Sequence, residues 1–232
     1  MQKSITQIGR EEDGNGGLVG RSIVGVREYI RENQLKPGDT LPSESAFAEK
    51  LNVSRTVTRE AFRALAALGI LEVGNGRKAR VSAPDASPLS MIIDHTVYTK
   101  QLSYQQVLDV RRTLELRTAS LAALRRSDTQ ATALFDLVTR MFATIEQPDE
   151  LMELDIEFHE LIAIASGNSL YSIIVNSFRV ITQQTWHIGW RSRGTEENRM
   201  ENIRCHERIA TAIMAQNPVR VDFHPEVTRV AA

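Results

Sequence analysis

The residues from 41 to 81 constrain the fold of this chain more than any other stretch. They contain a short helical segment, a turn, a second helical segment that ends at Gly69, and two short apolar segments around a glycine-rich tip. Arg55, Arg59 and Arg63 are spaced four residues apart, so they fall on one face of the second helix. The arginines alone would fit the solvated face of an ordinary core helix. The flanking turn and hairpin instead favour a winged helix-turn-helix, whose second helix enters the major groove of DNA.

The starts and ends of these segments carry clear local signals. Residues 19–33 have apolar side chains at helical spacing, and Ser43 and Ser54 are placed to cap the two helices that follow. We expect residues 70–73 and 78–81 to pair as a β-hairpin across the glycine-rich tip. The side chains predicted to pack inward are Ala46, Phe47 and Leu51 on the first helix of the pair, and Ala61, Leu65 and Leu68 on the second.

Composition bounds the class of protein. The chain has 232 residues, of which 42% are hydrophobic and 25% charged, as in a water-soluble globular protein. It contains no run of eighteen apolar residues, so we expect no membrane span, and the polar N-terminus does not resemble a secretory signal. Cys205 is the only cysteine, which suits the reducing cytoplasm, where we place the protein.

Charge is distributed unevenly along the chain. Residues 19–82 carry 11 Lys and Arg against 7 Asp and Glu, whereas residues 83–232 carry 15 against 19. The first region therefore has a net charge of +4 and the second of −4, although the whole chain carries only −1. A basic N-terminal region joined to an acidic remainder indicates that only the first part meets a polyanion.

The remainder of the chain reads as helical almost throughout. Ser103 and Gln106 form a capping-box pattern, and Ser127, Pro148, Asn168 and Thr195 mark further helix starts. The predicted helices end near residues 126, 145, 166, 190 and 216, and their short connections predict an antiparallel bundle. The fold class is therefore mainly α, with one small β-hairpin. We divide the chain into a disordered tail (1–17), a winged helix-turn-helix domain (18–82), a linker (83–89) and an all-α bundle (90–232).

Three ionisable residues occupy positions in the bundle where apolar ones are expected. Asp155 and His159 lie four residues apart on one predicted helix, and His206 lies on the apolar face of another. A buried, unpaired group of this kind costs several kcal/mol, roughly, so each should have a partner. Two imidazoles and a carboxylate that converged in one cavity would suit a divalent transition metal. A local hydrogen bond within the Asp-x-x-x-His pair, and a satisfied core histidine at 206, are the competing interpretations.

Short motifs in the first domain resemble the winged-helix signature of the GntR family of bacterial transcription regulators. The motifs are Leu41-Pro42-Ser43-Glu44, Val53-Ser54-Arg55, Arg59-Glu60-Ala61 and Leu68-Gly69. The resemblance implies that the second helix reads an operator and that the hairpin tip approaches the minor groove. The expected DNA-contacting residues are Ser54, Arg55, Thr56, Thr58 and Arg59 on the helix, and Asn75, Gly76 and Arg77 at the tip. The family usually has arginine where this chain has Ser45, so one contact is missing.

The bundle resembles the FadR-type C-terminal domain, called FCD. The matching segments are Arg111 to Glu115, Phe158-His159, Ser166-Gly167-Asn168 and the region after His206. In that domain many members bind a metal through an Asp-x-x-x-His pair and two later histidines. The resemblance therefore implies Asp155, His159 and His206 as ligands of zinc or nickel. Thr228 occupies the usual fourth position; His224, one helical turn earlier, is a weak substitute because Pro225 disrupts a helix there.

Arg111 matches a family arginine that lies near the effector, and arginine binds carboxylates bidentately. From spacing alone, an ion pair with Glu115 explains Arg111 equally well. We therefore expect a homodimeric transcription regulator, a repressor, that binds a near-palindromic DNA operator and responds to a small organic acid. One alternative is a DNA-binding protein with an inert dimerisation bundle. The other is a zinc-dependent hydrolase, which lacks a His-Glu-x-x-His motif here.

Overall fold

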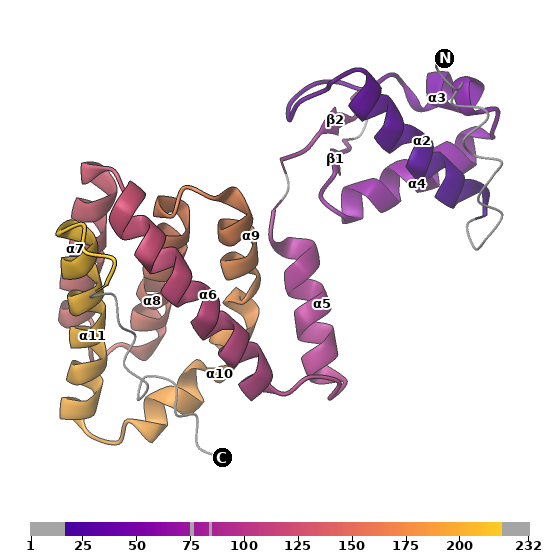
Figure 1. Ribbon diagram of the computed structural model, residues 1–232. Coiled ribbons are helices and arrows are strands. Elements are labelled where there is room, and N and C mark those ends of the chain that lie inside the picture. Colours follow the sequence, from indigo (N-terminus) through magenta and orange to yellow (C-terminus); the bar gives the residue numbers. More distant parts are fainter. Residues whose placement is uncertain (1–16, 75–76, 84, 220–232) are drawn as a thin grey trace. The chain divides into compact units, whose positions relative to one another are not determined.

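The computed structural model describes residues 17–74, 77–83 and 85–219 (Figure 1). These residues form two compact units that divide at Pro88, and each unit is described by itself. The predicted tail up to residue 16, the tip residues Asn75 and Gly76, and the weak ligand candidate His224 lie outside the described residues. The predicted fold class, a winged helix-turn-helix and an all-α bundle, is confirmed.

The described residues of the first unit form three helices and a two-stranded wing. Its elements are α2 (Leu18–Glu32), α3 (Glu44–Leu51), α4 (Arg55–Ala67), β1 (Leu71–Glu72) and β2 (Arg80–Val81). The Ser43 hydroxyl accepts from the amide of Ala46 at 3.2 Å, and that of Ser54 accepts from the amide of Val57 at 3.3 Å. Both predicted caps are therefore present. The two strands are antiparallel, with Leu71 opposite Val81.

An aromatic centre holds α2, α3 and α4 together. The ring of Phe47 on α3 makes edge contacts with Tyr29 on α2, at 5.0 Å between centroids, and with Phe62 on α4, at 5.4 Å. Leu65 is fully buried beside them. Ala46 and Leu68, predicted to be buried, are exposed instead, because Ala46 lies on the outer face of α3 and Leu68 is the C-cap of α4.

The described part of the second unit contains seven helices. They are α5 (Ser87–Tyr98), α6 (Tyr104–Arg125), α7 (Asp128–Ala143), α8 (Pro148–Ala165), α9 (Ser169–Ser177), α10 (Arg179–Ser192) and α11 (Glu196–Met214). α6 and α7 each begin with a complete capping box, built from Ser103 with Gln106 and from Ser127 with Gln130. α5 begins at Ser87, so the last three residues of the predicted linker are helical. No described helix is long and apolar enough to cross a membrane.

One predicted helix is two helices. The segment from Asn168 to Trp190 divides at Phe178, which ends α9 and begins α10. The Phe178 ring is buried with Val97, Val107 and Ile181. Packing of this ring against α5 and α6 therefore accompanies the change of direction, whereas the sequence around it contains neither glycine nor proline to signal a break.

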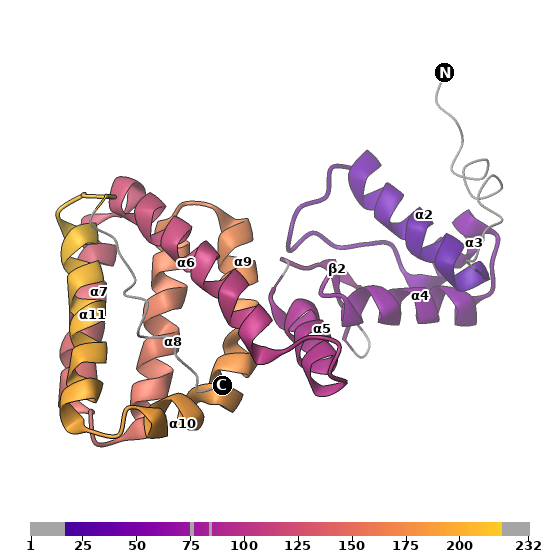
Figure 2. The same cartoon turned by 60° about the horizontal axis from the view of Figure 1, so that its bottom comes forward.

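α8 is the central helix of the bundle. It packs against α6, α7, α9 and α10, while α11 packs against α7 and α6 (Figure 2). Phe158, Ile162 and Leu151 of α8 are almost completely buried in the main apolar cluster. A polar residue on the inner face of α8 is therefore surrounded by other helices, which is where Asp155 and His159 lie.

Candidate DNA-reading helix and metal centre

α4 exposes most of the residues that were expected to contact DNA. Ser54, Arg55, Thr56 and Arg59 are exposed at the start of α4 and along its outer face. Their hydroxyl and guanidinium groups offer hydrogen-bond donors to base edges and phosphates. The described part of the wing adds Arg77, which is also exposed.

Thr58 does not belong to this set. Its side chain is 0% exposed, and its hydroxyl donates to the backbone carbonyl of Ser54 at 3.4 Å. Thr58 shares the inner face of α4 with Ala61, Phe62 and Leu65, at the spacing i, i+3, i+4 and i+7. The prediction of a DNA contact at Thr58 was wrong, because the hydroxyl counted as a donor faces the core.

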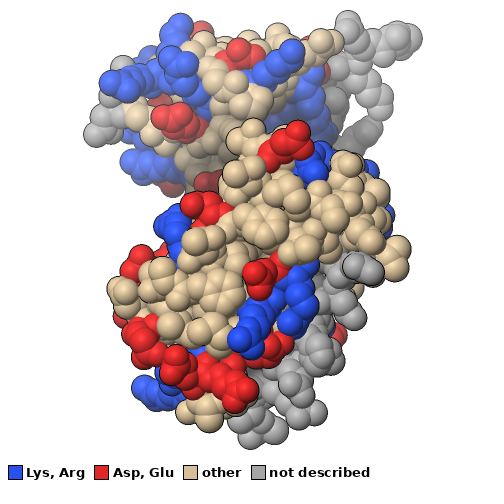
Figure 3. Space-filling model, turned by 90° about the vertical axis from the view of Figure 1, so that its left-hand side faces the viewer, with Lys and Arg blue, Asp and Glu red and all other residues tan. Residues whose placement is uncertain are grey.

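A cleft of about 660 Å³ separates the start of α3 and the outer face of α4 from the wing. The charged side chains that line it are Glu44, Arg59, Arg63, Arg77 and Lys78. Four cations therefore surround one carboxylate, and Ser45 lines the same cleft. On the face drawn in Figure 3, basic side chains predominate in the upper part of the view, whereas acidic side chains gather along its lower edge. The case for an anion-binding surface thus rests on this local cleft and on α4.

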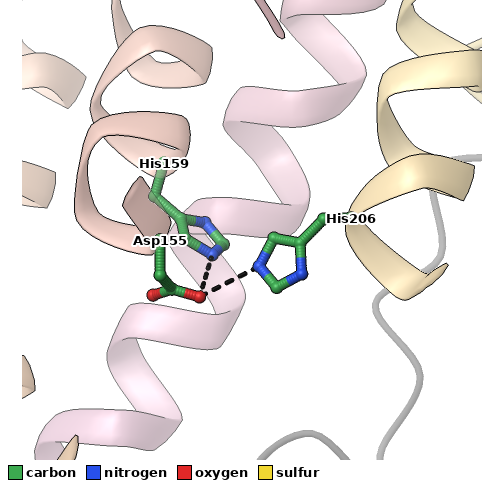
Figure 4. Close-up of side chains that lie close together, drawn as sticks. All are labelled: Asp155, His159 and His206. Carbon is green, nitrogen blue, oxygen red and sulfur yellow. Dashed lines mark hydrogen bonds and ion pairs between the residues drawn. The ribbon is translucent and has the colours of Figure 1, made fainter. Parts of the chain in front are cut away.

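In the second unit, Asp155, His159 and His206 converge. Each residue offers one ligand atom, and these atoms lie within 4.8 Å of one another (Figure 4). Nε2 of His206 is 3.0 Å from Oδ1 of Asp155, and Nε2 of His159 is 3.9 Å from the same oxygen. All three side chains are buried. The spacing of four residues places the first two on one face of α8, and α11 brings His206 to meet them.

The outer nitrogen of each imidazole faces an oxygen atom. Nδ1 of His206 lies 2.9 Å from the carbonyl oxygen of Asn202, which can only accept, so Nδ1 carries the proton. Nδ1 of His159 lies 3.2 Å from Oε1 of Glu115. Both rings direct Nε2 toward Asp155, as metal-ligating histidines do, and Nε2 of His206 is within hydrogen-bond distance of that carboxylate, so a bound metal would take the place of the Nε2 proton. Two imidazole nitrogens and one carboxylate oxygen fit a divalent transition metal such as zinc or nickel.

Arg111 on α6 borders this cluster. Its Nε donates to Oε1 of Glu115 at 2.6 Å, its Nη1 donates to the hydroxyl of Thr182 at 2.7 Å, and its Nη2 is 3.8 Å from Oδ2 of Asp155. The ion pair with Glu115 that spacing alone suggested is therefore present. Arg111 is also directed at the cluster, and Oε1 of Glu115 is shared between Arg111 and His159.

The surroundings set the charge of each group. Burial acts to raise the pKa of Asp155, but the hydrogen bond from His206 and the charges of His159, His206 and Arg111 outweigh it, so this pKa lies well below its ordinary value. Burial lowers the pKa of His159. Burial also acts to lower the pKa of Arg111, but Glu115 and Asp155 raise it above the usual value. At neutral pH the cluster thus contains a carboxylate and an uncharged His159, the forms that bind metals.

Three partners of this site were not predicted from the sequence. Glu115 was visible only as the residue four positions after Arg111, and its contact with His159 depends on how α6 packs on α8. Thr182 and the carbonyl of Asn202 carry no sequence signal. Trp186 is buried in the main apolar cluster of the bundle.

The fold and these two sites define a class of protein, namely transcription regulators with a winged DNA-binding domain and a helical effector-binding domain. Residues 25–81 match the gntR family of bacterial regulatory proteins, and residues 106–222 match the FCD domain. The chain therefore belongs to the GntR family and carries an FCD domain.

Individual relatives agree with this membership. The chain is 33% identical to the HTH-type transcriptional regulator LutR of Bacillus subtilis, over 83% of this chain and 89% of LutR. It is 30% identical to the Glc operon transcriptional activator of Escherichia coli K12 (83% and 78% covered) and 25% identical to the galactonate operon transcriptional repressor of that organism (85% and 87%). Among solved structures, Streptococcus agalactiae GntR superposes with a TM-score of 0.56 at 29% identity, covering 88% of this chain and 93% of that one.

Proposed function

We propose that this regulator is a repressor whose affinity for DNA is set by a small organic acid, bound beside a divalent metal in the bundle. The convergence of Asp155, His159 and His206 is the observation that carries the proposal. Two chains form a homodimer in the cytoplasm and present their α4 helices to the half-sites of a near-palindromic operator. On each α4 helix, Ser54, Arg55, Thr56 and Arg59 face the DNA.

The chemistry of the bundle favours a carboxylate as effector. A metal held by Asp155, His159 and His206 supplies a Lewis-acidic position for ligand oxygens. Arg111 lies beside it, with Nη2 directed toward Asp155, so it can bind a carboxylate oxygen. The name of the galactonate operon repressor, a relative, points to the same ligand chemistry. We propose a small hydroxy acid or dicarboxylate for this chain.

Control of DNA binding requires that the acid favour one arrangement of the dimer over another. α6 carries Arg111 and Glu115, whereas α8 and α11 carry the proposed metal ligands. A ligand that contacts Arg111 and the metal therefore links three helices of the bundle. Allosteric coupling between two sites typically changes an affinity by about 5- to 150-fold.

The direct test measures DNA binding with and without acid. A duplex selected by the protein from a random-sequence library serves as the operator, and a panel of hydroxy acids and dicarboxylates is titrated by fluorescence anisotropy. At least one acid should change the dissociation constant about fivefold or more. His206→Ala should retain DNA binding but lose this response. A response that is unchanged in His206→Ala would remove the metal from the proposal, and no response to any acid would favour an inert dimerisation bundle.

A reporter gene placed behind the selected duplex tests the direction of regulation. We expect expression to rise when the regulator gene is deleted. The Glc operon relative is an activator by name, so the opposite result, a fall in expression, is the one that would contradict repression.

A further inference from the structure

Arg59 and Arg63 lie one turn apart on α4, yet each is held by a glutamate in a different way. Nε of Arg59 donates to Oε2 of Glu44 at 3.0 Å. Nη1 of Arg63 instead lies 3.0 Å from Oε1 of Glu60. The side chains of both pairs are exposed, by 55% and 37% in the first pair and by 65% and 49% in the second. Exposed pairs of this kind contribute little to folding stability, so another role must distinguish them.

The atom that is held decides what the guanidinium can still do. Pairing at Nε leaves both terminal Nη groups of Arg59 available, and no described residue accepts a hydrogen bond from them. These two groups form the edge that binds two acceptors at once, either O6 and N7 of guanine or two phosphate oxygens. In Arg63 the carboxylate already occupies one Nη group. α4 therefore presents one arginine whose Nη1–Nη2 edge is fully available and a neighbour whose Nη1–Nη2 edge is partly occupied by a carboxylate.

The position of Glu44 makes its effect specific to Arg59. Glu44 is the first residue of α3, directly after the capping Ser43, and it lies fifteen residues before Arg59 in the sequence. A residue of α3 thus fixes the direction of a side chain on α4. Both residues line the cleft between α4 and the wing, among Arg63, Arg77 and Lys78.

A carboxylate in such a cleft has a cost for DNA binding. It repels phosphates and so weakens the contacts that are independent of sequence. Its benefit can arise only where the oriented Arg59 meets the correct base pair. The same group would then lower non-specific affinity and raise specific affinity, a combination that increases discrimination between sequences.

We propose that Glu44 is a positioning residue for DNA recognition, which holds Arg59 through Nε so that its Nη edge meets the DNA. This inference rests on the proposed contact of Arg59 with the operator. Glu60 has no such role, because it binds Arg63 at a terminal Nη group. The Glu60→Ala variant is therefore a matched control on α4, the helix of Arg59, with the same loss of one exposed carboxylate.

The experiment compares two affinities for each full-length variant. The probes are the best duplex that the wild-type chain selects from a random-sequence library and a scrambled duplex of equal composition, both titrated at one salt concentration. The measured quantity is the specificity ratio, that is, the dissociation constant for the scrambled duplex divided by the dissociation constant for the selected duplex. Glu44→Ala should lower this ratio about tenfold, the scale of one bidentate base contact. Glu60→Ala should tighten binding to both duplexes slightly and leave the ratio unchanged.

Two further variants separate orientation from charge. Glu44→Gln keeps an oxygen that accepts from Nε but removes the charge, so it should retain most of the ratio. In an Arg59→Ala background, Glu44→Ala should have no further effect on the ratio. Circular dichroism melting of each variant verifies the fold.

The outcomes divide clearly. An unchanged ratio in Glu44→Ala, a loss in Glu44→Gln as large as in Glu44→Ala, or a further loss in the Arg59→Ala background would each overturn the positioning role. If Arg59→Ala itself leaves the ratio unchanged, the proposed contact of Arg59 with DNA fails. If Arg59→Ala lowers the ratio but Glu44→Ala does not, only the role of Glu44 fails.

Discussion

Replacing Glu115 with glutamine tests how Arg111 and the proposed metal ligands depend on each other. Oε1 of Glu115 is 2.6 Å from Nε of Arg111 and 3.2 Å from Nδ1 of His159, and the Glu115 side chain is only 10% exposed. Glutamine keeps the size but removes the charge. Two properties should change, namely the stability of the metal-free bundle and its affinity for metal.

The stability change follows from the burial of Arg111. Its side chain is 14% exposed, and without Glu115 its nearest carboxylate oxygen is that of Asp155 at 3.8 Å. Removing one partner of a buried ion pair costs about 3–5 kcal/mol. We expect about 3 kcal/mol, the lower end, because the glutamine oxygen still accepts from Nε and Asp155 remains. Urea unfolding in the presence of a chelator measures this quantity.

The metal affinity should fall for a separate reason. Oε1 of Glu115 lies 3.2 Å from Nδ1 of His159, on the side of the ring away from Asp155, so its charge favours the orientation that directs Nε2 inward. Loss of such an outer partner typically lowers metal affinity 10- to 100-fold, roughly. Competition between the protein and a chromophoric chelator for Zn²⁺ measures the change.

Glu160→Gln is the control, because its partner Arg179 is 40% exposed. It should cost about 0–1 kcal/mol and leave metal affinity unchanged. If Glu115→Gln bound zinc as tightly as the wild type, Glu115 would not orient His159. If the variant were as stable as the wild type, buried Arg111 would not depend on Glu115.

Three other substitutions test separate parts of the account. Arg55→Ala should weaken binding to the selected duplex at least about tenfold in anisotropy titrations, and an unchanged affinity would remove Arg55 from the DNA surface. Thr58→Val should change that affinity less than about twofold, because Thr58 is buried; a larger loss in a variant that melts normally would count against the observed orientation of α4. Phe158→Ala should lower the free energy of unfolding by about 3–5 kcal/mol in urea, whereas a loss below about 1 kcal/mol would show that α8 is not central to the core.

Features that depend on one helical turn were predictable from the sequence. The Ser103 capping box is an example, because its donors and acceptors lie within three residues of each other. The winged helix-turn-helix followed from similar local signals in a fixed order. The break at Phe178 was not predictable, since it accompanies the packing of a ring against α5 and α6 rather than any residue that disfavours helix. Thr58 shows a third case, in which the correct helix was predicted but the face of one residue was misjudged.

The candidate metal site could be predicted from the sequence only in part. The sequence indicated that Asp155 and His159 share one face of a helix, because a spacing of four residues requires it. Spacing alone did not indicate that His206, fifty-one residues after Asp155, meets them, since that depends on how α11 packs in the bundle; only the resemblance to the FCD domain implied it. The contact of Glu115 with His159 is equally non-local, so the link between Arg111 and the cluster appears only in three dimensions.

Metal content is the most direct test of the central claim. The full-length protein, purified without chelator, should contain one equivalent of a transition metal per chain by elemental analysis, and zinc or nickel is expected. His206→Ala should lose this metal while its circular dichroism spectrum remains that of the parent. No metal in the parent after incubation with zinc or nickel, or the same content in His206→Ala, would contradict a metal centre built from Asp155, His159 and His206.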